Sequence, residues 1–185
     1  MRKKILGALL AILMLFSTVS LTGCSRQSAN ADSWSTIQKR KTVIVGLDDS
    51  FVPMGFRAKS GQLKGFDIDL ARAVFKKYNI KVDFQTIDWS MNATELRNHT
   101  IDLIWNGYTI TPQRKKVVRF SAPYLENKQI LVTMKKDKIN SFAGMKGKVL
   151  GVQTGSSGYS SLEAEPNLLK NYIKNKEEFP SWRSG

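Results

Sequence analysis

Between residues 41 and 124, short apolar segments lie before and after an amphipathic segment at 68–78. Apolar and β-branched residues dominate 42–46 and 101–105, and apolar and polar residues alternate around 82–84, so each of these segments predicts a strand. Strands that alternate with helices are typical of an α/β fold with a largely parallel sheet. A helix over 68–78 is predicted by apolar residues at helical spacing, Ile68, Ala71, Val74, Phe75 and Tyr78, with Asp67 as its expected N-cap.

Further apolar segments follow the polar residues 125–128. Segments 129–133 and 149–152 each predict a strand, and the turn-rich residues 142–147 separate them. Residues 153–158 then lead into another predicted helix, whose start offers free backbone amides and hydroxyls.

The first 23 residues have the pattern of an export signal. Basic residues 2–4 precede the apolar run 5–16, which as a helix is too short for a hydrocarbon core of about 30 Å. Leu21-Thr22-Gly23-Cys24 resembles the bacterial lipobox, which implies cleavage before Cys24 and lipidation of its thiol. A plain signal peptide with an incidental cysteine is the alternative. Residues 24–40 are expected to be the lipidated cysteine and a flexible tether, with folding beginning near Lys41.

The chain carries a net charge of +14, and Arg2, Lys3 and Lys4 supply three of these charges, which leaves +11 after cleavage. Such a charge can indicate nucleic acid, an anionic membrane surface or simple solubility. The sequence has no zinc-ligand spacing, RNA-binding aromatic signature or concentrated basic block, so we expect no nucleic-acid partner. His99 is the only histidine, which excludes a histidine-rich metal site, and we expect no cofactor.

Residues 106–120 contain the candidate binding chemistry. Gly107 ends the strand 101–105, Thr111 occupies an N-cap position, and Pro112 follows at the first helical position. A helix start favours an anion, and the guanidinium of Arg114 can hold a carboxylate through two parallel hydrogen bonds. The stretch therefore predicts a carboxylate site, unless it is merely a capped surface helix with solvated cations.

Together with residues 65–71 and 120–124, this stretch resembles the bacterial extracellular solute-binding proteins of family 3, which serve polar amino acid ABC transporters. The resemblance covers about residues 42–157. It implies a periplasmic-binding-protein type II fold with a first α/β lobe over 41–124, a hinge over 125–128 and a partial second lobe over 129–185. The family's late carboxylate for the ligand ammonium and its second hinge crossing are not found, so we expect a C-terminally truncated protein whose binding is impaired.

The resemblance also implies the site residues. Arg114, Thr109 and Gly107 would bind the ligand carboxylate, and aromatic rings would flank the ligand. Asp48 would contact the ligand side chain, although Asp49 competes for that role, and two residues from the second lobe would complete the contacts. The full ligand-binding set is Asp48, Phe51, Trp89, Gly107, Thr109, Arg114, Gln153 and Ser156.

The function implied is capture of a free amino acid by a protein anchored at the extracellular face of the cell membrane, for delivery to the subunits of an ABC permease. The alternatives are a prephenate or arogenate dehydratase, or a ligand-sensing domain on the same fold. A dehydratase needs a general acid or base at its leaving group, and Asp48 and Asp49 are the only pocket carboxylates that can be placed. We therefore expect a binding protein and not an enzyme.

Overall fold

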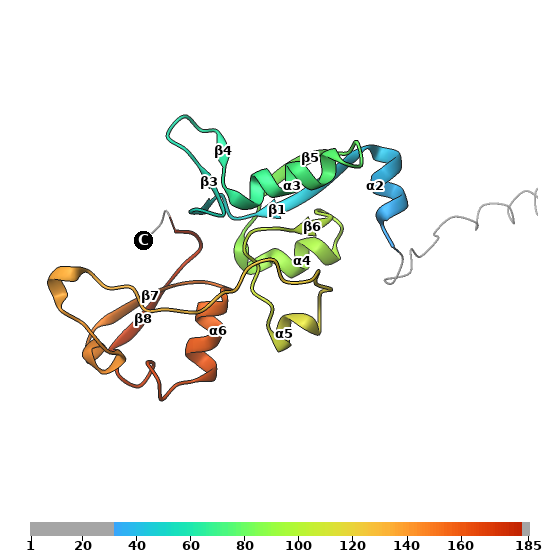
Figure 1. Cartoon of the computed structure of the whole chain (residues 1–185). Helices are drawn as coiled ribbons and strands as arrows, with labels where there is room; N and C mark the ends of the chain where they lie inside the picture. Colours follow the sequence, from blue (N-terminus) through green and yellow to red (C-terminus); the bar gives the residue numbers. More distant parts are fainter. Residues whose placement is uncertain (1–31, 183–185) are drawn as a thin grey trace, which may run out of the picture. The chain divides into compact units, whose positions relative to one another are not determined.

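The computed structural model describes residues 32–182. Figure 1 shows the order of the elements along the chain. The helices are α2 (Trp34–Arg40), α3 (Phe66–Lys76), α4 (Asn92–Arg97), α5 (Pro112–Lys115) and α6 (Ser157–Ala164), with short 3-10 helices at η1 (Trp89–Met91), η2 (Lys135–Asp137) and η3 (Phe142–Met145). The strands are β1 (Thr42–Leu47), β2 (Ser50–Phe51), β3 (Gly55–Arg57), β4 (Leu63–Lys64), β5 (Lys81–Thr86), β6 (Leu103–Ile104), β7 (Val149–Gln153) and β8 (Asn175–Phe179).

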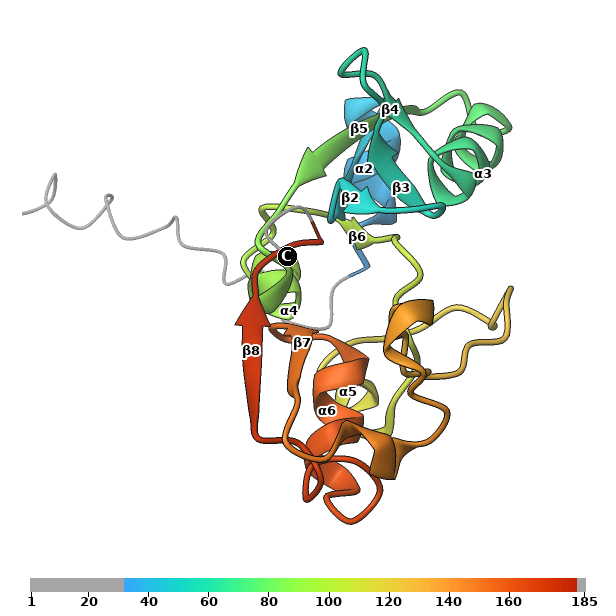
Figure 2. The ribbon, with the colours of Figure 1, turned by 90° about the vertical axis from the view of Figure 1, so that its left-hand side faces the viewer.

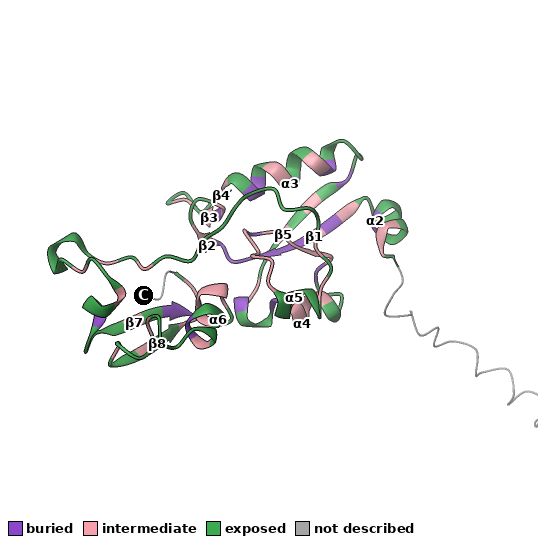
Figure 3. Cartoon of the chain, turned by 60° about the horizontal axis from the view of Figure 1, so that its bottom comes forward, coloured by how far each residue is buried: buried purple, intermediate pink, exposed green. Residues whose placement is uncertain are grey.

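A three-stranded parallel sheet, in the order β5-β1-β6, positions the candidate site. Val45 in the central strand is in register with Phe84 on one side and with Leu103 on the other. The helix α3 lies on one side of this sheet and α4 on the opposite side (Figures 1 and 3). The predicted strands and the parallel α/β arrangement are therefore confirmed for this part of the chain.

The core lies on β1 and on the helices packed against it. Val43 and Val45 are completely buried, and Phe75 and Ile80 complete a cluster with Ile37. The buried residues of Figure 3 concentrate along β1 for this reason. Each such side chain contributes about 1.5–3 kcal/mol through burial, so the central strand is well held.

The expected tether over residues 24–40 is wrong at its C-terminal end. Residues 34–40 form α2, in which Ile37 is 6% exposed within the core cluster. The ring of Trp34 also meets Tyr78 edge to face, with ring centroids 5.3 Å apart. The polar composition of this segment predicts a tether, but two apolar contacts are enough to dock a two-turn helix.

The start of α3 also differs from the prediction. The N-cap is Gly65, and Asp67 lies inside the first turn with its side chain completely buried. The carboxylate does not cap the helix, because it accepts hydrogen bonds from residues distant in sequence, which are described below. The apolar face is confirmed for Ile68, Ala71 and Phe75, whereas Tyr78 lies beyond the helix and is 57% exposed.

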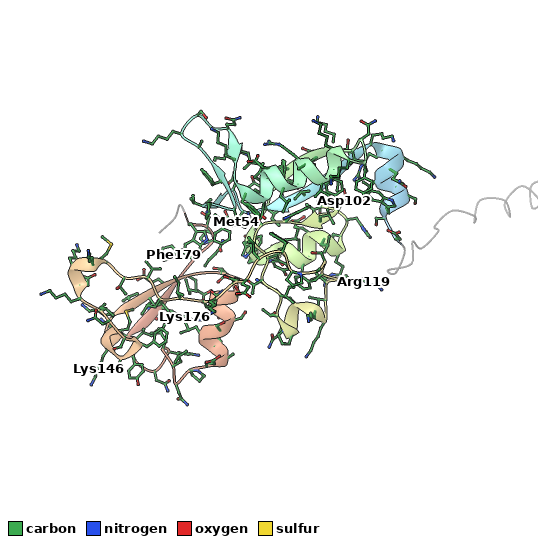
Figure 4. The ribbon with its side chains drawn as sticks, viewed as in Figure 1. Met54, Asp102, Arg119, Lys146, Lys176 and Phe179 are labelled. Atoms are coloured by element: carbon green, nitrogen blue, oxygen red, sulfur yellow. The ribbon has the colours of Figure 1, made fainter. Side chains whose placement is uncertain are left out.

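Strands β2, β3 and β4 form a small antiparallel sheet. A further sheet is formed by the parallel strands β7 and β8, beside which α6 lies (Figure 2). Lys176 of β8, labelled in Figure 4, donates to the carboxylate of Glu163 in α6 at 2.9 Å and so links strand and helix. The prediction for 149–152 is confirmed, but the strand predicted over 129–133 is wrong. No strand in residues 32–182 pairs with this segment, and Ile130 and Val132 are 77% and 80% exposed.

No helix among the described residues is long and apolar enough to span a membrane. The predicted signal over residues 1–23 and the predicted lipidation of Cys24 lie outside those residues. All elements described here belong to one compact unit, Trp34–Gly185.

We predict that Ile37→Ala lowers the free energy of unfolding by about 2–4 kcal/mol, because it removes a buried side chain that docks α2 on the core. Thr36→Ala is the matched control, since Thr36 is exposed in the same helix and its loss should change stability by no more than about 0.5 kcal/mol. Urea denaturation followed by circular dichroism measures both. Equal stabilities of the two variants would show that α2 does not contribute to the fold.

Candidate functional site

Arg114 lies at the centre of the candidate site, on the short helix α5. The side chain of Thr111 accepts a hydrogen bond from the backbone N–H of Arg114 at 3.1 Å, and Pro112 occupies the first turn. The predicted helix start is therefore confirmed in detail. Because the cap holds the first turn rigidly, the guanidinium projects from a fixed position on the backbone.

The guanidinium of Arg114 binds two backbone carbonyls from different parts of the chain. Nη1 donates to the carbonyl of Thr109 at 3.0 Å, and Nη2 donates to the carbonyl of Gly155 at 3.1 Å. No ion pair of Arg114 occurs in residues 32–182. Burial lowers the pKa of Arg114 below its ordinary value. The site thus holds a half-buried cation that lacks an anionic partner within the described chain.

Aromatic rings pack against the guanidinium of Arg114. The central guanidinium carbon of Arg114 lies 4.0 Å from the ring centroid of Tyr108, a cation–π arrangement. Tyr108 in turn stacks on Phe120, meets Trp89 edge to face at 5.6 Å, and donates its hydroxyl to Asn92. Trp89 is 6% exposed. Although its neighbours in the sequence are polar, the ring is buried because it packs against Tyr108. These rings fix the direction in which Arg114 points.

Thr109 joins Arg114 to two further segments. Its hydroxyl oxygen accepts hydrogen bonds from the side-chain amide of Asn127 at 2.6 Å and from the hydroxyl of Ser157 at 3.2 Å. Asn127 belongs to the predicted hinge, and Ser157 is the first residue of α6. Figure 2 shows the start of α6 next to α5, which agrees with these contacts.

Asp48, which follows β1, and Gln153, at the end of β7, form a second contact between the β5-β1-β6 sheet and the β7-β8 sheet. The amide of Gln153 donates to Asp48 at 2.6 Å and to the carbonyl of Pro180 at 3.2 Å. The other carboxylate oxygen of Asp48 accepts from the backbone and hydroxyl of Ser50. Both Asp48 and Gln153 are 5% exposed. Asp49, the competing candidate, instead pairs with Arg57 and accepts from Thr86.

The glycines at this site allow close approach of neighbouring segments. Gly107 has a φ of +58°, and a Cβ there would lie 3.0 Å from the ring of Phe51. Gly155 has a φ of +70°, and a Cβ there would lie 2.8 Å from the Cα of Ser90. Both positions therefore disfavour any side chain on conformational and steric grounds. Phe51 is half-buried against the Gly107 turn.

The side chain of Ser156 has a structural partner. Its hydroxyl oxygen accepts from the backbone N–H of Tyr159 at 3.0 Å, which caps α6. The adjacent Gly155 and Ser157 make the contacts to Arg114 and Thr109. The structure therefore places this predicted residue beside the site, with its neighbours in direct contact.

Asp67 holds the Gly107 turn in place. Its carboxylate accepts from the backbone N–H of Gly107 at 2.6 Å and from the hydroxyl of Tyr124 at 2.7 Å. Burial raises the pKa of Asp67 above its ordinary value, and the hydrogen bonds from Tyr124 and Gly107 oppose that shift. The carboxylate thus connects α3, the turn before Arg114 and the entrance to the predicted hinge.

Several residues of the site were not predicted. Tyr108 lies between the predicted residues Gly107 and Thr109. Its aromatic ring was the one sequence feature that could have suggested a contact with a cation. Ser157 and Asn127 had only their polar character, which is common in loops. The contact of Arg114 with Gly155 could not be predicted from the sequence, because it is made by a backbone carbonyl. Among the described residues, no group of three or more histidine, cysteine or acidic side chains could hold a metal ion.

The chain matches a known family and known structures. The sequence model of the bacterial extracellular solute-binding proteins, family 3, matches residues 43–180. The arginine-binding extracellular protein ArtP of Bacillus subtilis is 32% identical over 148 residues, covering 80% of this chain and 56% of that protein. The crystal structure of an ABC uptake transporter substrate binding protein from Streptococcus pneumoniae with bound histidine has a TM-score of 0.81 and 48% identity, covering 83% of this chain and 63% of that one.

A third similarity is relevant to enzyme activity. The ancestral amino acid-binding protein AncCDT-1, a precursor of cyclohexadienyl dehydratase, has a TM-score of 0.73 and 35% identity, covering 83% of this chain and 67% of that one. The relatives ArtP and the histidine-bound protein are named as binding proteins.

The parallel sheets and their helices, together with the match to solved structures, define an α/β protein of the periplasmic-binding-protein type II fold. The chain belongs to the bacterial extracellular solute-binding proteins, family 3. It spans 56% of the length of ArtP and 63% of the histidine-bound structure.

We predict that the contribution of Asp67 to stability decreases as pH rises. Because its pKa is raised on folding, the folded chain holds the proton more tightly, so the stabilisation is complete below the ordinary value of 3.8 and is lost as pH rises through the raised pKa. Asp67→Asn should flatten this dependence, since an amide can accept from Gly107 and donate to the hydroxyl of Tyr124.

Urea midpoints between pH 4 and pH 7 measure the effect. Asp69→Asn is the matched control, because Asp69 lies on the same helix with a side chain that is 79% exposed. Parallel pH curves for the parent chain and Asp67→Asn would contradict the prediction.

Proposed function

We propose that this chain captures a polar amino acid outside the cell and that Arg114 binds the α-carboxylate of that ligand. The proposal includes delivery to the subunits of an ABC permease. The named activities of the relatives support amino acid binding, since one is arginine-binding and another carries bound histidine. Residues 41–124, extended to include α2, correspond in this proposal to the first lobe, 125–128 to the hinge and 129–185 to part of the second lobe.

The observation that carries this proposal is the unpaired charge of Arg114. Within the described residues, the partly buried guanidinium donates to the Thr109 and Gly155 carbonyls and has no anionic partner. An anion at this position would remove that electrostatic cost, and a planar carboxylate matches the two parallel N–H groups of the guanidinium. Tyr108 holds the guanidinium plane in place, so the ligand would meet an already oriented partner.

The remaining predicted residues have supporting positions. Thr109 would offer its hydroxyl and backbone to the carboxylate, with Gly107 leaving room for the chain to turn. Phe51 lies against that turn and would present its ring to the ligand. Asp48 would contact a cationic or amide side chain of the ligand. For this the side-chain amide of Gln153 must first release the Asp48 oxygen to which it now donates. Ser156 would position Gly155 and Ser157 by capping α6, and Trp89 would position Tyr108 by packing against it.

A binding role is favoured over a dehydratase role. The relationship to a dehydratase precursor shows that this fold can lead to an enzyme. Asp48 and Asp67 each already accept hydrogen bonds at both carboxylate oxygens. A general acid or base must instead be available to a reacting proton. We therefore propose that the chain is not an enzyme.

The proposal also places the protein at the extracellular face of the membrane, anchored through a lipid on Cys24. The lipobox-like residues 21–24 and the family's extracellular role support this location. An anchored protein would keep a captured amino acid close to the permease.

We predict that Arg114→Ala weakens amino acid binding by about 2–5 kcal/mol, because it leaves the ligand carboxylate buried without its partner. Arg114→Lys should also weaken binding substantially, since an ammonium cannot form the bidentate pair. Calorimetric titration of residues 25–185 with L-arginine, L-histidine and L-glutamine measures this. Arg119→Lys is the matched control, because Arg119 is an exposed arginine in the same region (Figure 4).

Matched ligands test the chemistry of the contact directly. Agmatine and histamine lack the carboxylate of arginine and histidine but keep their side chains and an amine. Agmatine and histamine should therefore bind far more weakly than the parent amino acids. Equal binding of histamine and histidine, unchanged affinity in Arg114→Lys, or no amino acid binding at millimolar concentration would each overturn the proposal.

We predict that Cys24→Ala abolishes incorporation of labelled fatty acid in bacterial cells expressing the whole chain, because the thiol is the proposed acceptor. Ser25→Ala should label normally and serves as the control. Normal labelling of the cysteine variant would show that residues 21–24 are not a lipobox.

A further inference from the structure

Basic side chains gather at one end of the parallel sheet. Residues 34–43 and 70–82 contain no acidic residue, and their basic residues are Lys39, Arg40, Lys41, Arg72, Lys76, Lys77 and Lys81. Figure 1 shows α2, the C-terminal end of α3 and the start of β5 together at this end. The backbone N–H of Lys81 donates to the carbonyl of Lys41 at 2.9 Å, which joins the two segments.

Four of these cations line an open surface hollow of about 660 Å³. Lys41, Lys76 and Lys81 are exposed and form no ion pair within residues 32–182. Arg72 lies over the ring of Phe84 at 5.3 Å and is only weakly paired, with Asp69 at 3.6 Å. Asn79 adds a polar side chain to the same hollow. We call Lys41, Arg72, Lys76 and Lys81 the basic hollow.

An aromatic pair borders the basic hollow. Trp34 and Tyr78 meet edge to face, and Tyr78 is 57% exposed although it is a large ring. Tyr78 lies between Lys76 and Lys81 in the sequence, one residue before Asn79 of the hollow. Tryptophan and tyrosine beside lysines are the combination that suits the boundary between lipid headgroups and water, where a ring has one apolar and one polar end.

We propose that the basic hollow and the Trp34–Tyr78 pair form a docking surface for an anionic phospholipid membrane. The partner is identified by charge complementarity, since several uncompensated cations lie on one face next to interfacial aromatic rings. At about 100 mM salt, charges are screened beyond roughly 10 Å, so cations that line one hollow act together more strongly than cations spread over the surface. Each basic side chain near an anionic membrane contributes about a fivefold gain in partitioning.

The location of the surface along the chain fits the proposed lipid anchor. Trp34 begins the first described element, and nine residues lie between it and Cys24, a span of at most about 35 Å for an extended chain. Docking would hold this end of the sheet toward the membrane and so restrict the orientation of the amino acid site. This consequence rests on the proposed anchor, whereas binding to the membrane itself does not.

The test uses residues 25–185, which contain the whole compact unit but neither leader nor lipid acceptor. Sedimentation with vesicles of 30% phosphatidylglycerol in phosphatidylcholine measures partitioning at 100 mM salt, against pure phosphatidylcholine. The parent chain should bind the anionic vesicles and be released at 500 mM salt. A failed anchor would appear in fatty acid labelling and leave this result unchanged.

Two triple variants with equal change of net charge localise the surface. Lys41→Gln, Lys76→Gln and Lys81→Gln together should weaken partitioning by roughly 100-fold. The control changes Lys135, Lys136 and Lys138 to Gln, which are exposed lysines on and beside η2, and should retain most of the binding. The single variants Lys76→Gln and Lys81→Gln, with circular dichroism of each, separate lost charge from lost structure, and each should lose about fivefold.

Three outcomes would overturn the proposal. The parent chain could fail to bind anionic vesicles at 100 mM salt. Both triple variants could lose binding equally, which would show an effect of net charge alone. Duplex DNA or inorganic phosphate at equal phosphate concentration could displace the chain from vesicles through the same three lysines, which would show a general polyanion or phosphate site.

Discussion

The buried carboxylate of Asp67 is the interaction on which the candidate site depends. It reaches from the first turn of α3 to the backbone of Gly107 and to the hydroxyl of Tyr124, residues that are about 40 and 57 positions away. A completely buried carboxylate is costly unless its oxygens are satisfied, so few other arrangements of these segments are acceptable. Gly107 sets the direction of Tyr108, and Tyr108 orients Arg114. The position of one cation is thereby fixed by a carboxylate that never contacts it.

Local patterns predicted the elements of the parallel sheet well. Thr111 and Pro112 predicted a helix start correctly because capping depends on residues within one turn. Asp67 was misassigned as an N-cap because its true partners come from tertiary contacts, which no local pattern reports. Segment 129–133 has the composition of a strand, but a strand also needs a neighbouring backbone, and none pairs with it in the described chain. The docking of α2 depends mainly on Ile37 and Trp34, too few residues to produce a periodic signal.

The candidate site could be predicted where a side chain carries the chemistry. Arg114 and Asp48 are predicted from their charge and Gln153 from the family resemblance, and the structure gives each of them specific partners in another part of the chain. Backbone groups had no such signal, so the carbonyls that hold Arg114 were missed. The resemblance implies that Trp89 flanks the ligand, yet its ring is buried and packs edge to face against Tyr108. Polarity of neighbouring sequence is therefore a weak guide to the exposure of an aromatic ring.

The hydrogen bond from Arg114 to the carbonyl of Gly155 has a thermodynamic consequence for capture. An anion that approaches the Nη2 hydrogen now bound to the Gly155 carbonyl would compete with that carbonyl, so this mode of binding begins from conformations in which the contact is broken. The observed affinity then equals the intrinsic affinity multiplied by the fraction of molecules that are open. In the proposed binding, the Gly155 carbonyl would therefore raise the ligand concentration needed for half-occupancy without itself contacting the ligand.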